Sequence, residues 1–143
     1  MTASRSAPRA LVIGLDPYRV PGPWDPAPVA EQIEVGRRRF VEHGVEARFC
    51  LVGLDGSDDV DAVIGEALGE AAWECVVIGG GVRGDVALLE RVVDLVRERA
   101  PSSPIAFNET PADTYEAAAR WLVRPDASWD DGPHERRARD SNP

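Results

Sequence analysis

The feature that most constrains the fold is a short apolar run that ends in three glycines. Residues Cys75–Ile78 carry no charged side chain and include two valines and an isoleucine, a pattern typical of a strand buried on both faces. Gly79, Gly80 and Gly81 then interrupt the run, and an amphipathic pattern follows. In α/β proteins, a strand that ends in glycines before a helix brings backbone amides close to a ligand. The sequence therefore predicts a site at this point.

Apolar runs and amphipathic patterns alternate along the rest of the chain. Residues 10–14 form a second continuous apolar run, whereas residues 45–51 alternate apolar and polar side chains, as in an edge strand with one less buried face. Gly44 ends the first helical pattern, and Thr110 and Pro111 fit the N-cap and first position of the last one. The predicted strands are 10–14, 45–51, 75–78 and 105–107, and the predicted helices are 29–43, 58–71 (capped by Ser57 or Asp58), 85–99 and 111–122.

This alternation predicts an α/β fold with a parallel sheet. Strand–helix–strand connections of this length give parallel neighbours joined by right-handed crossovers. The two most apolar strands, 10–14 and 75–78, belong in the centre of the sheet, and 45–51 belongs at an edge. We therefore expect three layers around a four-stranded parallel sheet of order 2-1-3-4, the flavodoxin-like arrangement cut one unit short. The side chains expected to face the sheet include Val29, Ile33, Gly36, Phe40 and Val41 of the first helix and Val86, Leu89, Val92, Val93 and Val96 of the third.

The chain length and the composition of the two ends bound the domain. A chain of 143 residues has the length of one domain. We expect a disordered lead-in at 1–9, a single domain at 10–123 and a disordered tail of acidic residues and arginines at 124–143. No apolar run approaches the ~20 residues of a membrane span, and the first residues lack the apolar core of a signal peptide, so we expect a cytoplasmic protein.

Charge and residue usage exclude several functions. The net charge of −9 repels nucleic acid and anionic membranes, so neither is an expected partner. All 16 bases are arginines, and the absence of lysine rules out lysine Schiff-base catalysis and a Walker-type phosphate loop. Cys50 and Cys75 lie in apolar strand runs and are expected to be small buried hydrophobes. With only two histidines, a histidine-rich metal site is excluded. We expect neither a metal nor a cofactor.

The expected site lies beyond the carboxyl ends of the first and third strands, where the winding of the sheet reverses. Loops after three strands meet there. Asp16 offers a carboxylate for proton transfer, and Asn108 offers an amide that orients a carbonyl or carboxylate, so these two are the candidate catalytic residues. The candidate ligand-binding residues are Tyr18, Arg19, Gly79, Gly80, Gly81, Val82, Arg83, Glu109 and Thr110.

Several of these residues have a structural interpretation beside the functional one. Arg83 follows the glycines at a helix start and suits a carboxylate or phosphate, but it equally suits an ion pair with Asp16 or Asp85. Asp16 precedes Pro17, and Asp-Pro readily starts a turn. For Thr110 we favour the helix-capping role.

Residues 79–84 also match the dinucleotide-binding pattern G-x-G-x-x-G between a strand and a helix, and Glu109 lies at the end of the next strand, where a ribose-binding acid would lie. The pattern follows the third strand rather than the first, however, and Asp85 places a negative charge near any pyrophosphate. We therefore favour the interpretation that the glycines permit a tight turn and close helix–sheet packing.

Three segments carry a resemblance to known proteins. V-I-G-L-D-P-Y at 12–18, V-V-I-G-G-G-V-R at 76–83 and F-N-E-T-P-A-D-T at 107–114 are similar to segments of small flavodoxin-like bacterial proteins of unassigned function, a likeness that runs over 11–122. This resemblance implies the fold and the position of the site. Residues 14–22 also resemble the water-activating segment of uracil-DNA glycosylases, but Leu15 and Arg19 replace the expected glutamine and histidine, and a His-Pro-Ser loop is absent. A signalling receiver domain would share the topology, but it needs a lysine, and Gly79 replaces its phosphorylated aspartate.

From these observations we expect an enzyme that acts on a small anionic metabolite, with Asp16 moving a proton and Arg83 anchoring the anion. Two alternatives stay open: a ligand-binding or regulatory module that uses the same crevice without catalysis, and a structural or interaction protein without a functional crevice. We also expect a homodimer, because a four-stranded parallel sheet has two bare edges. Trp73, Trp121 and Trp129 moreover supply more aromatic surface than so small a core needs.

Overall fold

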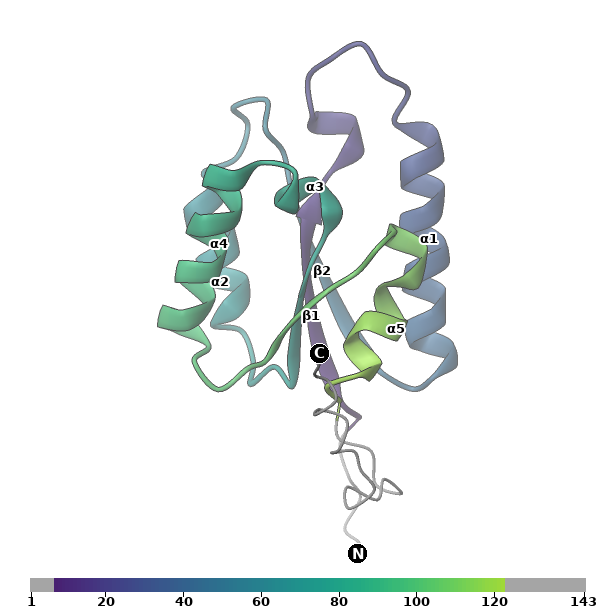
Figure 1. The fold of residues 1–143 in the computed structure, drawn as a ribbon, viewed down its shortest axis with the longest axis vertical. Helices are drawn as coiled ribbons and strands as arrows, with labels where there is room; N and C mark the ends of the chain where they lie inside the picture. The colour runs from purple at the N-terminus through teal and green to yellow at the C-terminus, as the bar shows by residue number, and fades with distance from the viewer. Residues whose placement is uncertain (1–6, 123–143) are drawn as a thin grey trace, which may run out of the picture.

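The computed structural model describes residues 7–122, which form an α/β domain around one parallel sheet (Figure 1). Residues 1–6 and 123–143 lie outside the described part, as do most of the predicted lead-in, the predicted tail and Trp129. The sheet has four strands in the order β2-β1-β3-β4, all parallel. This confirms the predicted fold class and strand order. The strands are β1 (Arg9–Leu15), β2 (Glu46–Val52), β3 (Cys75–Ile78) and β4 (Ile105–Phe107).

Helices cover both faces of the sheet. In Figure 1, α1 and α5 lie on one side of the strands, and α2 and α4 lie on the other, with α3 at the end where β1 and β3 finish. The α-helices are α1 (Ala27–Glu42), α2 (Val60–Leu68), α3 (Gly80–Arg83), α4 (Val86–Arg99) and α5 (Thr114–Ala119). Two short 3₁₀ helices, η1 (Pro17–Arg19) and η2 (Pro111–Asp113), follow β1 and precede α5. Among the five α-helices, α3 was not predicted, because three glycines in a row indicate a turn rather than a helix.

The alternation of side chains along each strand divides the core in two. Leu11 and Ile13 of β1 face α2 and α4, where they join Val76 and Ile78 of β3. Val12 lies on the opposite side of β1, in the cluster that holds residues of α1 and α5. Both cysteines are buried and unpaired, Cys50 in the first cluster and Cys75 in the second, as predicted.

Aspartate side chains cap two of the α-helices, α2 and α4. Asp59 and Asp85 are the N-caps of α2 and α4, accepting hydrogen bonds from the amides of Ala62 and Leu88. The prediction that Ser57 or Asp58 caps α2 is therefore wrong: the cap is the next residue along the chain. Thr110 is the N-cap of the η2–α5 segment and Pro111 its first residue, as predicted.

Two valines that were predicted to be buried are exposed. Val41 is 77% exposed, because Ile33, Gly36 and Phe40 form the buried row of α1 and Val41 lies about 100° around the helix from Phe40. Val86 is 67% exposed, since the buried row of α4 is centred on Leu88, Val92 and Val96.

Trp73, predicted to be surface aromatic area, is buried instead, and its indole Nε1 donates to the carbonyl of Ala67 at 3.1 Å. Trp121 is exposed, as expected. No helix within residues 7–122 combines the length and the apolar character needed to cross a bilayer.

Candidate functional site

A cavity of about 380 Å³ opens at the carboxyl ends of β1 and β3, on the side of the sheet that α1 covers. Most of its wall is aliphatic or aromatic. Its apolar lining residues are Val12, Leu15, Pro17, Val20, Trp24, Val29, Ile33, Phe49, Leu51 and Pro111. The polar part of the wall consists of Asn108, Glu109, Thr110 and Thr114, and four glycines (Gly14, Gly79, Gly80 and Gly81) supply backbone alone.

The cavity exists because glycines lie where side chains would otherwise fill the core. Gly14 follows Val12 on the α1 side of β1, and Gly79 directly follows β3. The second half of α1 packs closely on η2, since a Cβ on Gly36 would lie 2.3 Å from the carbonyl oxygen of Pro111. The first half of α1, with Val29 and Ile33, faces the glycine positions and leaves a hollow.

The structure brings six of the candidate site residues to this cavity: Gly79, Gly80, Gly81, Asn108, Glu109 and Thr110. The other candidates do not line it. Val82 is fully buried in the core on the α2–α4 side of the sheet. Asp16, Tyr18, Arg19 and Arg83 lie around the cavity without forming its wall.

Arg83 hydrogen-bonds Asn108, which is part of the cavity wall. Its Nη1 donates to Asn108 Oδ1 at 3.1 Å and to the carbonyl of Ile78 at 2.8 Å, and its guanidinium lies over the Phe107 ring. No ion pair among the described residues joins Arg83 to Asp16 or Asp85, so neither of the predicted partners holds it. Asp85 instead caps α4.

Asn108 is buried, with 5% of the residue exposed, and its side chain accepts one hydrogen bond and donates another. Asn108 Nδ2 donates to Thr114 Oγ1 at 2.9 Å, and this hydroxyl donates to the carbonyl of Pro111 at 2.7 Å. Because an arginine only donates, Oδ1 must face Arg83 and the amide cannot be flipped. One Nδ2–H beyond the bond to Thr114 remains available, so Asn108 can donate to a ligand.

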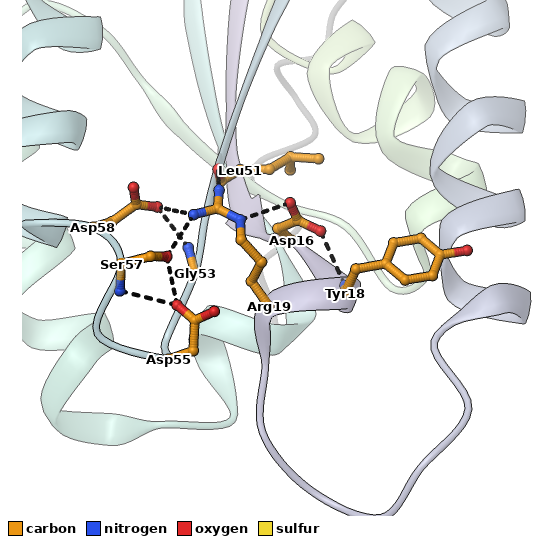
Figure 2. A network of polar contacts seen from close by, with 8 residues as sticks. All are labelled: Asp16, Tyr18, Arg19, Leu51, Gly53, Asp55, Ser57 and Asp58. Atoms are coloured by element: carbon orange, nitrogen blue, oxygen red, sulfur yellow. Dashed lines mark hydrogen bonds and ion pairs between the residues drawn. The ribbon is translucent and has the colours of Figure 1, made fainter.

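Asp16 and Arg19 form a separate network on the side of η1 that faces the loop with Asp58 (Figure 2). Asp16 caps η1 by accepting the amide of Tyr18 at 3.0 Å, and its second oxygen accepts Arg19 Nε at 3.0 Å. Arg19 Nη1 donates to Asp58 Oδ2 at 2.8 Å. The hydrogen bond from the Gly53 amide, followed by the bond from Arg19, lowers the pKa of Asp58 below its usual range. Figure 2 shows the Tyr18 side chain extending away from this network, toward α1.

The backbone amides of Glu109 and Thr110, two further predicted residues, are hydrogen-bonded by Asp113. The Asp113 carboxylate accepts the amides of Glu109 and Thr110, at 3.1 and 3.2 Å. These bonds complete the reciprocal half of a capping box and fix the loop that forms one wall of the cavity. The described residues contain no group of three or more histidine, cysteine or acidic side chains placed to hold a metal ion.

Sequence reasoning missed the apolar part of the cavity wall. Val29 and Ile33 were predicted to face the sheet. The sequence did not reveal that they lie over glycines of the sheet end, which leave space for a cavity. Trp24 carried a signal, since it is the large apolar side chain of a proline-rich loop, and its ring lines the cavity. No protein-family model and no curated protein matches the chain.

Proposed function

We propose that this protein is a binding module for a small, largely apolar molecule that presents a hydrogen-bond acceptor to Asn108. The observation that carries the proposal is the apolar cavity at the carboxyl ends of β1 and β3. A hollow of about 380 Å³ falls within the usual size of small-molecule sites, and its place at the winding reversal is where α/β sheets bind ligands.

The dimensions bound the ligand. A volume of about 380 Å³ lies in the lower part of the range of small-molecule sites, so the cavity suits a small ligand. The aliphatic and aromatic lining favours a compact apolar body. The buried amide of Asn108 favours a carbonyl or another acceptor at one end, because a buried donor without a partner is costly.

The charges favour a neutral ligand over the anion that the sequence led us to expect. No arginine is among the described residues that line the cavity, and the one charged side chain in the wall is Glu109. Arg83 is not part of the cavity wall, and its guanidinium hydrogen-bonds the Asn108 amide, which it holds in place. A ketone, aldehyde or amide therefore suits the wall better than a carboxylate or phosphate.

The geometry favours binding over catalysis. The proposed proton-transfer residue, Asp16, already accepts hydrogen bonds from Arg19 and from the Tyr18 amide, and it is not part of the cavity wall. Asn108 is a donor and an acceptor rather than a base. The enzyme hypothesis would regain support if a bound molecule were turned over.

The first experiment tests the cavity with acetophenone, a neutral aromatic ketone of about nine non-hydrogen atoms, for which we expect a Kd on the order of 1 mM. Val29→Phe adds an aromatic ring to the cavity wall, whereas Val41→Phe makes the same change at an exposed position of the same helix. Titration followed by NMR should show binding to the wild type and to Val41→Phe, and at least tenfold weaker binding to Val29→Phe. Equal binding by all three proteins would refute this site.

A second experiment tests the polar end of the ligand. α-Methylstyrene has the shape of acetophenone but carries CH₂ where the ketone has oxygen. Asn108→Asp can still accept from Arg83, but it has no N–H to offer, and it keeps a bond to Thr114 only if that hydroxyl turns from the Pro111 carbonyl to the new carboxylate. A neutral hydrogen bond contributes about 0.5–1.5 kcal/mol, so the ratio of the two affinities should shift toward α-methylstyrene roughly 2- to 13-fold in the variant. An unchanged ratio would remove Asn108 from the proposal.

A further inference from the structure

One wall of the cavity is a loop with hydrogen bonds of its own. Residues 20–25, which we call the flap, join η1 to the segment before α1, and Val20 and Trp24 of the flap line the cavity. Trp24 Nε1 donates to the carbonyl of Val20 at 3.1 Å, and the Trp24 amide donates to the carbonyl of Gly22 at 3.0 Å. The flap thus has hydrogen bonds of its own, and it begins directly after Arg19, the residue at its root.

Arg19 ties that root to the loop between β2 and α2, far away in the sequence. Its guanidinium reaches Asp58 at 2.8 Å, Ser57 Oγ at 2.9 Å and the carbonyl of Leu51 at 3.4 Å, while Nε holds Asp16 (Figure 2). The Arg19 carbonyl also accepts the amide of Leu54 at 2.9 Å. The root of the flap is therefore bonded to the β2–α2 loop by side chain and by backbone.

The fit around Arg19 is close. A Cβ on Gly53 would lie 2.9 Å from both Cβ and Nη1 of Arg19, nearer than such atoms pack, so only glycine at this position lets the side chain pass. The side chains of Arg19, Asp16 and Asp58 are 33%, 29% and 20% exposed, so the two ion pairs are better shielded than the surface pairs elsewhere in the domain. A planar guanidinium bonds two carboxylates in different directions at once, which a lysine ammonium does less well.

We propose that Arg19 is a positioning residue: by fixing the flap root to the β2–α2 loop, it holds Trp24 over the cavity and slows the release of a ligand that it does not touch. This inference rests on the proposed function, since release presupposes binding. It gives Arg19 an indirect part in binding, in place of the direct contact that the sequence led us to expect.

The test uses the full-length protein labelled with 5-fluorotryptophan, with acetophenone as the probe. The ¹⁹F resonance of Trp24, assigned by its loss in Trp24→Phe, reports the position of the flap without any ligand. Arg19→Gln removes both ion pairs, and Gly53→Ala displaces the Arg19 side chain without removing a charge. The matched control is Arg91→Gln, which breaks the exposed pair between Arg91 and Asp61 on α4 and α2.

We expect Arg19→Gln and Gly53→Ala to shift or broaden the Trp24 resonance and to speed acetophenone release on the order of tenfold, while Arg91→Gln changes neither. An unmoved Trp24 resonance in Arg19→Gln, or the same change in Arg91→Gln, would overturn the inference. If wild-type protein fails to bind acetophenone, the proposed function fails, and the ¹⁹F spectra alone then decide whether Arg19 positions the flap.

Discussion

Replacing Gly36 by alanine should lower the stability of the domain, although the same change stabilises most helices. Gly36 lies inside α1, where alanine is favoured over glycine by about 1 kcal/mol. Its Cβ would lie 2.3 Å from the carbonyl oxygen of Pro111, a backbone atom that cannot rotate away. Overpacking costs about 1–3 kcal/mol, and so short a contact with backbone favours the upper part of this range. The net result is a loss of about 1–2 kcal/mol in the free energy of unfolding.

The matched control is Gly65→Ala in α2. There the nearest atom to the new Cβ is Nη1 of Arg99, at 3.1 Å, and this tip of a flexible side chain can move. Chemical denaturation should show Gly65→Ala equal to or more stable than the wild type and Gly36→Ala less stable. Since Pro111 also lines the cavity, Gly36→Ala should weaken acetophenone binding as well. A Gly36→Ala variant as stable as Gly65→Ala would refute the close packing of α1 on η2.

Three further predictions concern single side chains. Arg83→Met leaves Asn108 Oδ1 without its donor, so it should lower the free energy of unfolding by about 1–3 kcal/mol in urea titrations and weaken acetophenone binding. The pKa of Asp58 is lowered in the folded state, mainly by the Gly53 amide, so its contribution to stability is complete above about pH 4 and is lost as the pH falls through the lower folded pKa. The difference in Tm between wild type and Asp58→Asn should therefore be largest at neutral pH and shrink below about pH 4. Burial raises the pKa of the Cys75 thiol to about 12, so mass spectrometry should find it unmodified by iodoacetamide at pH 8 until the protein is unfolded.

The strands and their order were predictable because buried parallel strands leave a simple signal. The runs at 10–14 and 75–78 are apolar without interruption, and this alone places them in the centre of the sheet. The glycines at 79–81 lie at the end of the sheet where the cavity opens. The predicted helix boundaries, which were based on caps and glycines, differ from the observed ones by a few residues.

The directions of the arginine side chains were not predictable from the sequence. Arg19 and Tyr18 are neighbours in one 3₁₀ turn, yet Figure 2 shows them pointing to opposite sides. Arg19 takes the side on which it bonds Asp58, which belongs to a loop distant in the sequence. The hollow was hidden for a related reason: it requires the first half of α1 to lie over Gly14, and only the tertiary structure places these segments together.

The most direct test of the account is methyl NMR of the wild-type protein during titration with acetophenone. We expect shifts at Val29, Ile33 and Leu51, which line the cavity, and intermolecular NOEs from these methyl groups to the probe. Leu89 and Val93 of α4, which pack against the core on the other side of the sheet, should stay unchanged. Shifts centred on Leu89 and Val93, or none at millimolar probe, would contradict the claim that this cavity is the binding site.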